Sequence, residues 1–473
     1  MGTVEYKNGD TIEIKGTKSN VDNTATLTII NNSSASLNLT GGTQKTIISG
    51  TNASNFTATN PSLFTLIPGN STSFTVNFKT NVLGDKVAEL SIPNDDLTNS
   101  NFKLNLKGVF EPKETWVLSG NMNASRGDLI SNILADGKII VSGGYDGASG
   151  LLSSEILDPE IGNWSLTGNM STQRIRHSSA EITGNQVLIS GGYISGAGTV
   201  LNSSEIYNSN TKNWTQAGNM NTPRYGHQLI RLQNGKILAV GGSISNACGD
   251  CVTKTTEIFD PNTGLWSSTG STNIVRPGDK NGILLNDGRV LIVGGYVGNW
   301  PPGYTISSSC EIYNPLTDNW TLTGSMNSVR SPGTFGIVLL NNGKVLVSGG
   351  FDNNTTTLSS TEIFDPNSGT WTVSTNMNNP RVQHTSVLLD NGNVIVIGGY
   401  FRTAGLTTIN LAAELFNPSL GRWSTTAEIS EGKIQFATKK LKSGAVIIIG
   451  GSIYNSQLAS FPNSTKKAEI YFP

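Results

Sequence analysis

A pair of adjacent glycines recurs seven times along residues 115–473, at intervals of 48 to 55 residues. Before each pair runs a strand-length aliphatic segment, as in KIIVSGG, RVLIVGG and NVIVIGG. A repeat of this length limits a chain to architectures in which one supersecondary unit is stacked on copies of itself, such as solenoids and propellers. The first glycines of the seven pairs are Gly143, Gly191, Gly241, Gly294, Gly349, Gly398 and Gly450.

Each repeat contains four strand-like segments. The aliphatic segment follows a tight turn such as ADGK, QNGK or NNGK, in which Asp-Gly and Asn-Gly tolerate positive φ and join two antiparallel strands. After the glycine pair comes a third segment, which carries a glutamate followed by an apolar and usually an aromatic residue. In six repeats a tryptophan lies nine residues beyond that glutamate: Trp164, Trp214, Trp266, Trp320, Trp371 and Trp423.

The seventh repeat ends in KKAEIYFP and has no tryptophan segment of its own. A spare one precedes the first repeat, where ETWVLSGNM around Trp116 matches GNWSLTGNM around Trp164. We therefore predict a seven-bladed β-propeller over residues 112–473, closed by the strand around Trp116. Such closure removes the open sheet edges that would otherwise pair with other chains.

These repeats resemble kelch repeats in the double glycine, the glutamate before an aromatic residue, the tryptophan and the MNTPR-type turn before the next repeat. The resemblance covers about three-quarters of the chain and recurs seven times. It implies a kelch-type seven-bladed propeller, the fold that the strand count reaches from periodicity and turn chemistry.

Residues 1–111 do not share the repeat. Alternating segments such as TATLTII, STSFTVNF and FKLNLKGVF predict about eight strands of a β-sandwich, so that the whole chain is all-β. The order of these segments resembles the choice-of-anchor D type of immunoglobulin-like domain, in its disulfide-free branch. That resemblance implies a bacterial extracytoplasmic protein, either at the cell surface, periplasmic or secreted, or a lipoprotein whose signal is absent from this chain.

Composition excludes several partners and leaves the cysteines open. The formal net charge is -1, so no overall field favours nucleic acid, and no apolar run is long enough for a transmembrane segment. Cys248 and Cys251 form CGDC in a long loop, which favours a loop disulfide over free thiols, with a redox or metal site less favoured. Cys310 takes a position held elsewhere by Ser, Thr or Ala, which is typical of a small buried side chain.

A cation recurs ten residues after each tryptophan. Seven cations match seven glutamates, so the favoured interpretation is a buried ion pair in each blade or between neighbouring blades. The alternative is an anion-binding ring near a central opening, because arginine offers a forked donor set. The residues are Arg126, Arg174, Arg224, Arg276, Arg330 and Arg381, with Lys433 in the last repeat.

The three histidines occupy one position of the repeat. His177, His227 and His384 each follow one of those arginines by three residues. A catalytic or metal site needs unlike residues that converge from different positions, so this regularity favours a structural role. We therefore predict no catalytic residue, no metal site and no cofactor.

Insertions are concentrated in the loop between the second and third strands, which lies on the same face as the connection to the next blade. Variable loops on one face are typical of the binding side of a repeat protein. Exposed aromatic residues anchor proteins and stack on sugars, although those directly after the glycines are also candidates for packing between blades. The candidate binding aromatics are Tyr296, Trp300, Tyr304, Tyr400 and Phe401.

The sequence thus favours a monomeric, non-enzymatic binding or adhesion protein whose variable propeller face contacts a protein or glycan. The alternative is a carbohydrate-active enzyme, because the kelch resemblance also includes copper-radical sugar oxidases and sialic-acid mutarotases. The oxidase version requires a Tyr-Cys cross-link, a second tyrosine and two histidines at one site. Here the histidines follow the repeat, and no lone cysteine is a clear partner for a tyrosine.

Overall fold

The computed structural model describes residues 4–183, 185–245, 251–276, 281–297, 305–353, 356–403, 406–455 and 460–473. The chain divides into two compact units, Met1–Leu118 and Ser119–Tyr471. Strands dominate both units, and the helical element among the described residues is a 3-10 turn, η1 (Ala53–Asn55). No helix in these ranges has the length and apolar character that a membrane crossing requires.

The first unit holds two main sheets, of order β1-β9-β8-β4 and β2-β7-β5, and a short β3-β6 pair. Strand β1 runs parallel to β9, and the other pairs are antiparallel. Nine strands form where about eight were expected, because two of them are only two residues long. They are β1 (Thr11–Gly16), β2 (Asn23–Ile30), β3 (Leu37–Asn38), β4 (Ile47–Ser49), β5 (Phe56–Ala58), β6 (Thr65–Leu66), β7 (Ser71–Phe78), β8 (Lys86–Pro93) and β9 (Asn101–Phe110).

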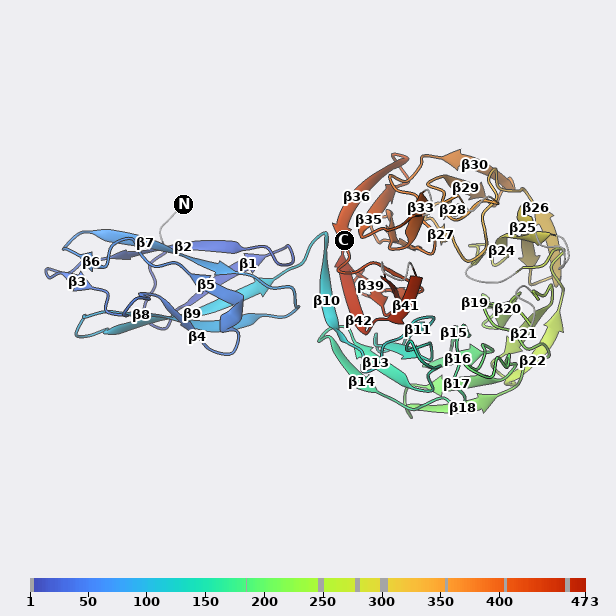
Figure 1. Cartoon of the computed structure of the whole chain (residues 1–473), viewed down its shortest axis with the longest axis horizontal. Helices are drawn as coiled ribbons and strands as arrows, with labels where there is room; N and C mark the ends of the chain where they lie inside the picture. Colours follow the sequence, from blue (N-terminus) through green and yellow to red (C-terminus); the bar gives the residue numbers. More distant parts are fainter. Residues whose placement is uncertain are drawn as a thin grey trace. The chain divides into compact units, whose positions relative to one another are not determined.

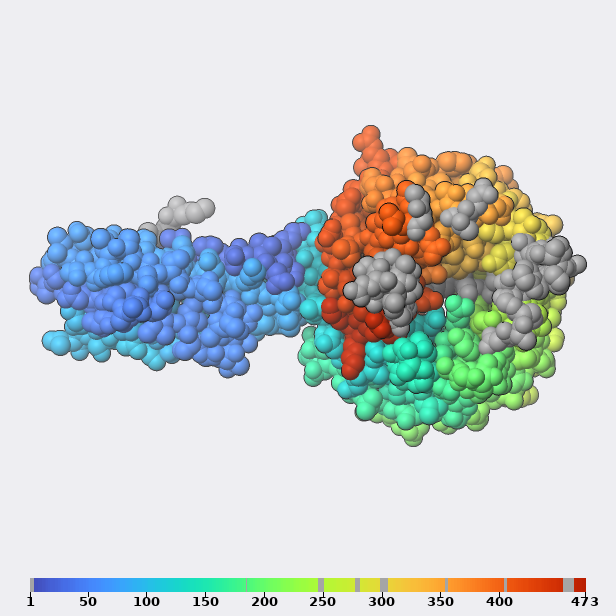
Figure 2. All heavy atoms as spheres, in the orientation of Figure 1, coloured from blue at the N-terminus to red at the C-terminus, as the bar shows by residue number. Residues whose placement is uncertain are grey.

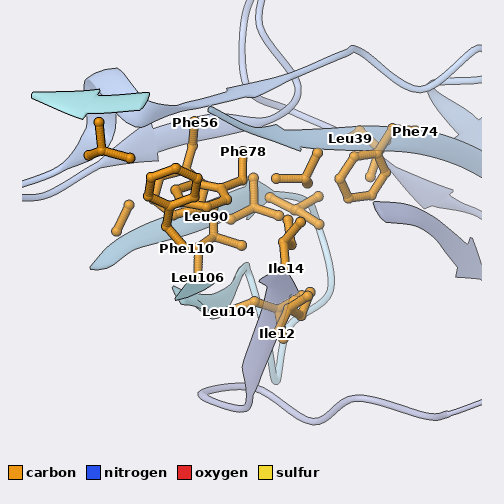
Figure 3. Packing of buried hydrophobic residues seen from close by; sticks show 14 residues of the cluster. Ile12, Ile14, Leu39, Phe56, Phe74, Phe78, Leu90, Leu104, Leu106 and Phe110 are labelled. Atoms are coloured by element: carbon orange, nitrogen blue, oxygen red, sulfur yellow. The ribbon is translucent and has the colours of Figure 1, made fainter. Parts of the chain in front are cut away.

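The core of this unit takes side chains from both main sheets (Figure 3). Alternate residues of β7 are buried, so Phe74, Val76 and Phe78 face inward while the serine and threonine residues between them face outward. Phe78 meets Phe56 with the ring centroids 5.3 Å apart. This alternation is what a sheet with one buried face requires.

The second unit contains seven four-stranded sheets among the described residues, here called blades one to seven. Blades one to six each take four strands in chain order, from the innermost to the outermost. Their strands are β11 (Ile130–Ile133), β12 (Ile139–Ser142), β13 (Ser154–Asp158), β14 (Asn163–Leu166), β15 (Ser178–Ile182), β16 (Gln186–Ser190), β17 (Ser204–Asn208), β18 (Asn213–Ala217), β19 (Gln228–Arg231), β20 (Ile237–Val240), β21 (Thr256–Asp260), β22 (Leu265–Thr269), β23 (Gly282–Leu284), β24 (Val290–Val297), β25 (Thr305–Asn314), β26 (Asn319–Thr323), β27 (Gly336–Leu339), β28 (Val345–Ser348), β29 (Thr361–Asp365), β30 (Thr370–Ser374), β31 (Thr385–Leu388), β32 (Val394–Ile397), β35 (Ala412–Asn417) and β36 (Arg422–Glu428).

Blade seven closes the ring. Its strands are in the order β38-β39-β42-β10, so the segment around Trp116 forms the outermost strand beside the C-terminal one, as the repeat spacing predicts. The blades follow one another in chain order, and the last lies next to the first (Figures 1 and 2). The four strands are β38 (Ala437–Lys440), β39 (Val446–Ile449), β42 (Lys467–Phe472) and β10 (Thr115–Asn121).

Extra strands form in the loops between the second and third strands, where the sequence varies most in length. In blade four β24 and β25 continue beyond the blade, and blades six and seven carry small additional sheets. The insertions therefore lie in the predicted loop. The additional strands in these loops are β33 (Tyr400–Thr403), β34 (Leu406–Ile409), β40 (Ser452–Asn455) and β41 (Ser460–Ser464). Strand β40 also pairs with β37 (Lys433–Ile434), which precedes the first strand of blade seven.

Burial explains why the repeated residues have their identities. The second strands are almost entirely buried, as in VIVI of β32 and VIII of β39. In blades two to six the aromatic residue after the glutamate packs on the tryptophan of the outer strand, with ring centroids 5.0 to 5.2 Å apart. Aromatic pairs at this distance bury a large apolar area on a solvent-side strand.

Candidate functional site

The repeated arginine and glutamate form a buried ion pair within each of blades one to six. The arginine side chain is 0% exposed in all six, and its Nη2 lies 2.6 to 3.0 Å from Oε1 of the glutamate. The other guanidinium nitrogen, Nη1, donates to the carbonyl of the first glycine of the pair. In blade seven Lys433 replaces arginine and lies 3.0 Å from Glu469.

The glutamate also holds the turn that enters its blade. In blade one, Glu155 accepts backbone N–H groups from Asn123 and Ala124, at 2.6 and 3.1 Å. Burial alone would raise the pKa of this carboxyl, but these hydrogen bonds and the one from Arg126 outweigh it and hold the pKa below its ordinary value. Backbone N–H groups reach the equivalent glutamate in every blade.

The predicted anion-binding ring is therefore not an accessible feature. A guanidinium group with 0% exposure, already bonded to a carboxylate and to backbone carbonyls, has no free face for a dissolved anion. The structure supports the interpretation that the sequence favoured, a buried ion pair. Each pair ties the entry turn, the glycine pair and the third strand together. This correction concerns Arg126, Arg174, Arg224, Arg276, Arg330 and Arg381.

The histidine side chains pack between the glycine pairs of neighbouring blades. A Cβ on Gly143 of blade one would lie 2.6 Å from Cε1 of His177, and one on Gly192 of blade two would lie 2.9 Å from its Cβ. Leu129 and Phe436 take the same position in blades one and seven and press on the glycine pairs in the same way. Because leucine and phenylalanine can replace histidine here, we assign this position a packing role.

These histidines are neutral. Burial, with Arg174 and Arg126 nearby, lowers the pKa of His177 to about 3. Burial, with Arg381 and Arg330 nearby, does the same for His384, and the pKa of His227 also lies well below its ordinary value. Nε2 of His227 bonds to Ser190 Oγ at 2.9 Å, and Nε2 of His384 bonds to Ser348 Oγ at 3.0 Å.

A cavity of about 590 Å³ lies where the innermost strands begin. Its lining includes one position that differs from blade to blade, two residues after the buried cation, which we call the variable slot. At four of these positions a non-glycine residue has a left-handed backbone, with φ between 49 and 54°. The described residues of the variable slot are Asp128, Arg176, Gly226, Pro332, Gln383 and Gln435.

The left-handed conformation costs a non-glycine residue roughly 1–2 kcal/mol, so four such residues at one cavity are notable. Their polar side chains come from blades six, seven, one and two, which are adjacent in the ring. Blades three and five have Gly226 and Pro332 instead, without a polar side chain. One side of the cavity is thus polar, and Nε of Arg176 lies 3.6 Å from Oδ2 of Asp128 there.

Aromatic side chains lie beside the variable slot. The residue after the glycine pair forms a backbone bridge with the residue just before the slot, as Tyr193 does with Ile175. Tyr193 meets Tyr225 edge to face, with centroids 5.3 Å apart. Burial raises the pKa of Tyr193, while Arg176 lowers it and Asp128 raises it further, because both charges lie close to the ring.

The predicted binding aromatics have different environments. Tyr296 and Phe401 are half-buried, whereas Tyr400 is only 6% exposed and packs near Phe351, at 6.2 Å between centroids. Tyr400 is therefore mainly a packing residue rather than an exposed anchor. Trp300 and Tyr304 lie outside the described residues.

The cysteines divide as the sequence suggested. Cys251 is disulfide-bonded, and Cys310 is free and buried. Burial raises the pKa of the Cys310 thiol to about 11, so it is unreactive at neutral pH. Cys248 lies outside the described residues.

Sequence reasoning missed the variable slot. A search for repeats finds positions that recur, and this slot is recognisable only because it does not recur. The available signal was its position in the sequence. It lies two residues after the buried cation and just before the innermost strand of the blade begins.

The propeller repeats match known kelch proteins. A family model described as the KLHDC2/KLHL20/DRC7 Kelch-repeats domain matches residues 176–399. Kelch-like protein 28 of Homo sapiens is 37% identical over 109 residues, which are 22% of this chain and 18% of that protein. Galactose oxidase of Gibberella zeae is 28% identical over 169 residues, which are 35% of this chain and 23% of that protein.

A solved structure shares the fold over a longer stretch. A fungal alcohol oxidase of the AA5 family, in complex with copper, covers 76% of this chain and 75% of its own, with a TM-score of 0.58 and 16% identity. At that identity the likeness concerns the fold alone. The curated relatives above are matched over less than a quarter of their length, so their activities do not pass to this chain with the repeats.

Proposed function

We propose that this all-β, kelch-type propeller is a non-enzymatic binding protein that captures a protein or glycan partner at the mouth of its central cavity. The observation that carries the proposal is the variable slot. Its polar side chains differ between blades and keep a costly backbone conformation beside a cavity. Strain of this kind persists where surrounding structure holds it for a function.

The repeated polar groups are not available for this task. Arginine and glutamate of each blade neutralise each other in the interior, and the histidines fill gaps between glycine pairs. What remains for recognition is the variable slot, the half-buried aromatics beside it and the long loops on that face. The cavity volume of about 590 Å³ falls in the usual range of ligand sites, about 300–1,000 Å³.

Binding without catalysis agrees best with the donor groups of the described residues. Those residues contain no group of three or more His, Cys, Asp and Glu side chains that can hold a metal ion. The histidines that a copper site would need come singly from blades two, three and six, and two of them are bonded to serine. This set does not fit the copper of the alcohol oxidase whose fold is similar.

An extracytoplasmic location is the second part of the proposal. The disulfide of Cys251 supports an oxidising compartment, because disulfides rarely persist in a reducing cytosol. In this role the N-terminal unit is a spacer that carries the propeller, in the manner of an immunoglobulin-like domain on a bacterial surface protein.

The test is a binding screen of the full chain on arrays of glycans and of peptides. The double variant Asp128→Ala/Arg176→Ala removes a polar pair from the cavity. The matched control is Asp287→Ala/Arg289→Ala, which removes a partly exposed Asp–Arg pair, 2.7 Å apart, at the tight turn before β24. We expect binding that the first variant loses and the control keeps. Binding that both variants retain in full would refute the cavity as the site.

A further inference from the structure

The cavity lining is dominated by neutral hydrogen-bonding groups. Amides come from Gln228, Gln383 and Gln435, and hydroxyls come from serine and threonine residues of the inner strands. Amides and hydroxyls both donate and accept hydrogen bonds, so the lining offers a mixture rather than one sign. A ligand with groups that also do both matches such a surface best.

Two of these groups have no hydrogen-bond partner among the described residues. They are Oε1 of Gln383 and Oγ1 of Thr438, both of them buried atoms. Buried polar atoms are usually paired, so these orphan atoms indicate where a hydroxyl-bearing ligand or its water would bind.

The charged groups in the described lining do not form a cluster of free cations for an anionic ligand. Asp128 presents a carboxylate next to Arg176, so their fields largely cancel at a distance. Lys439 is the one other charged residue among those that line the cavity. The six interior arginines, which would otherwise attract an anion, are already neutralised by glutamates.

Three tyrosines lie close to the variable slot, although they are not among the residues that line the cavity. Tyr145 and Tyr193 form backbone bridges with the residues just before Asp128 and Arg176, Tyr225 contacts the ring of Tyr193, and all three rings are half-buried. A half-buried aromatic ring keeps accessible surface, against which the apolar face of a sugar can pack. Gly226 and Pro332 bring no polar side chain to the lining.

We infer that the cavity binds the terminal residue of a neutral oligosaccharide, with its vicinal hydroxyls on Gln383, Gln435 and Asp128 and its ring against the tyrosines. This inference rests on the proposed function and names the ligand class for the same site. An acidic peptide or an acidic glycan would need a cluster of available cations, which the described lining does not supply. A neutral polyol satisfies both donors and acceptors.

The experiment measures binding of the full chain to three arrays: neutral oligosaccharides, glycans with uronate or sulfate groups, and peptides. The variants are Gln383→Leu and Gln435→Leu, each of similar volume to glutamine. The control is Gln216→Leu, an exposed residue of the outer strand β18. Loss of one or two hydrogen bonds should weaken neutral-glycan binding by about tenfold or more, with the control unchanged and the melting temperature of all three kept.

The outcomes separate the two proposals. Neutral-glycan binding that both cavity variants weaken supports the ligand class. Binding of acidic glycans or peptides that depends on Gln383 and Gln435 overturns the ligand class but keeps the cavity as the binding site. Binding that none of the variants changes, or no binding on any array, overturns both.

Discussion

Two positions of the repeat, two residues apart, differ in burial and in how much their side chains vary. The buried cation is the same in six blades, has no exposed surface and is fully explained by the ion pair and carbonyl contacts of its own blade. Two residues later, the variable slot has a different side chain in almost every blade and lines a cavity. The difference teaches that the chemistry which recurs holds this ring together, while the chemistry which varies is available for recognition.

Removing the cation of one ion pair should have the largest effect on stability. Arg224→Ala leaves Glu257 buried without its cation and should lower the free energy of unfolding by about 3–5 kcal/mol. Denaturant unfolding measures the effect, with Arg231→Ala, an exposed arginine of β19, as the control. An unchanged melting temperature for Arg224→Ala would contradict the pairing role.

The buried histidines predict that stability depends on pH. Because the folded pKa values of His177 and His384 are about 3, below the ordinary 6.5, the unfolded chain binds protons that the folded chain does not. Stability should therefore be complete above pH 6.5 and fall as the pH drops toward 3, by roughly 1 kcal/mol per histidine one pH unit below 6.5.

Replacing a buried histidine with leucine tests whether that histidine causes the pH dependence. His177→Leu should keep stability at pH 7 within about 1.5 kcal/mol, because Leu129 fills the same position in blade one, and should flatten the pH profile. Unfolding curves between pH 7.5 and 5 check both statements. A profile that is unchanged in the leucine variant would show that other groups titrate.

The glycine pair gives an intermediate effect. Gly143→Ala places a methyl group 2.6 Å from His177 at φ +60°, whereas Gly264→Ala has a similar φ of +71° and nothing within 4 Å. Both variants lose roughly 1–2 kcal/mol to the left-handed backbone, and only the first adds a clash, which costs about 1–3 kcal/mol more. Equal melting temperatures for the two variants would contradict the packing of His177 against Gly143.

The smallest effect is expected at the variable slot. Gln435→Gly relieves the left-handed strain at φ 54°, so we expect stability unchanged or higher by up to about 1 kcal/mol, as Gly226 already occupies this slot in blade three. Chemical denaturation measures this change. A large loss of stability would mean that Gln435 has a packing role like that of the buried cation.

Much of the fold could be predicted because its determinants recur. Glycine pairs, the glutamate and the tryptophan each appear at fixed spacing, and the missing tryptophan strand of the last repeat identifies Trp116 as its substitute. Ion pairing of the arginines followed from equal numbers of cations and glutamates. Their complete burial did not, because an anion-binding ring gives the same count.

The candidate site could not be predicted in the same way. The variable slot has no motif, and its importance depends on the left-handed backbone and on four blades meeting at one cavity. Aromatic identity was a misleading guide at Tyr400, which the sequence places next to exposed loop residues and the fold buries at 6% exposure. Burial of one ring and exposure of the next depend on local strand pairing, which composition does not encode.

Blade six allows the most direct test, because Arg381 and Gln383 stand two residues apart in one chain segment. The measurement is the melting temperature of Arg381→Ala and Gln383→Leu, each with and without saturating neutral oligosaccharide. The account predicts a lower melting temperature for the arginine variant, and for the glutamine variant an unchanged baseline with loss of the ligand-induced rise. A glutamine variant that is as destabilised as the arginine variant, or that keeps the full ligand-induced rise, would contradict it.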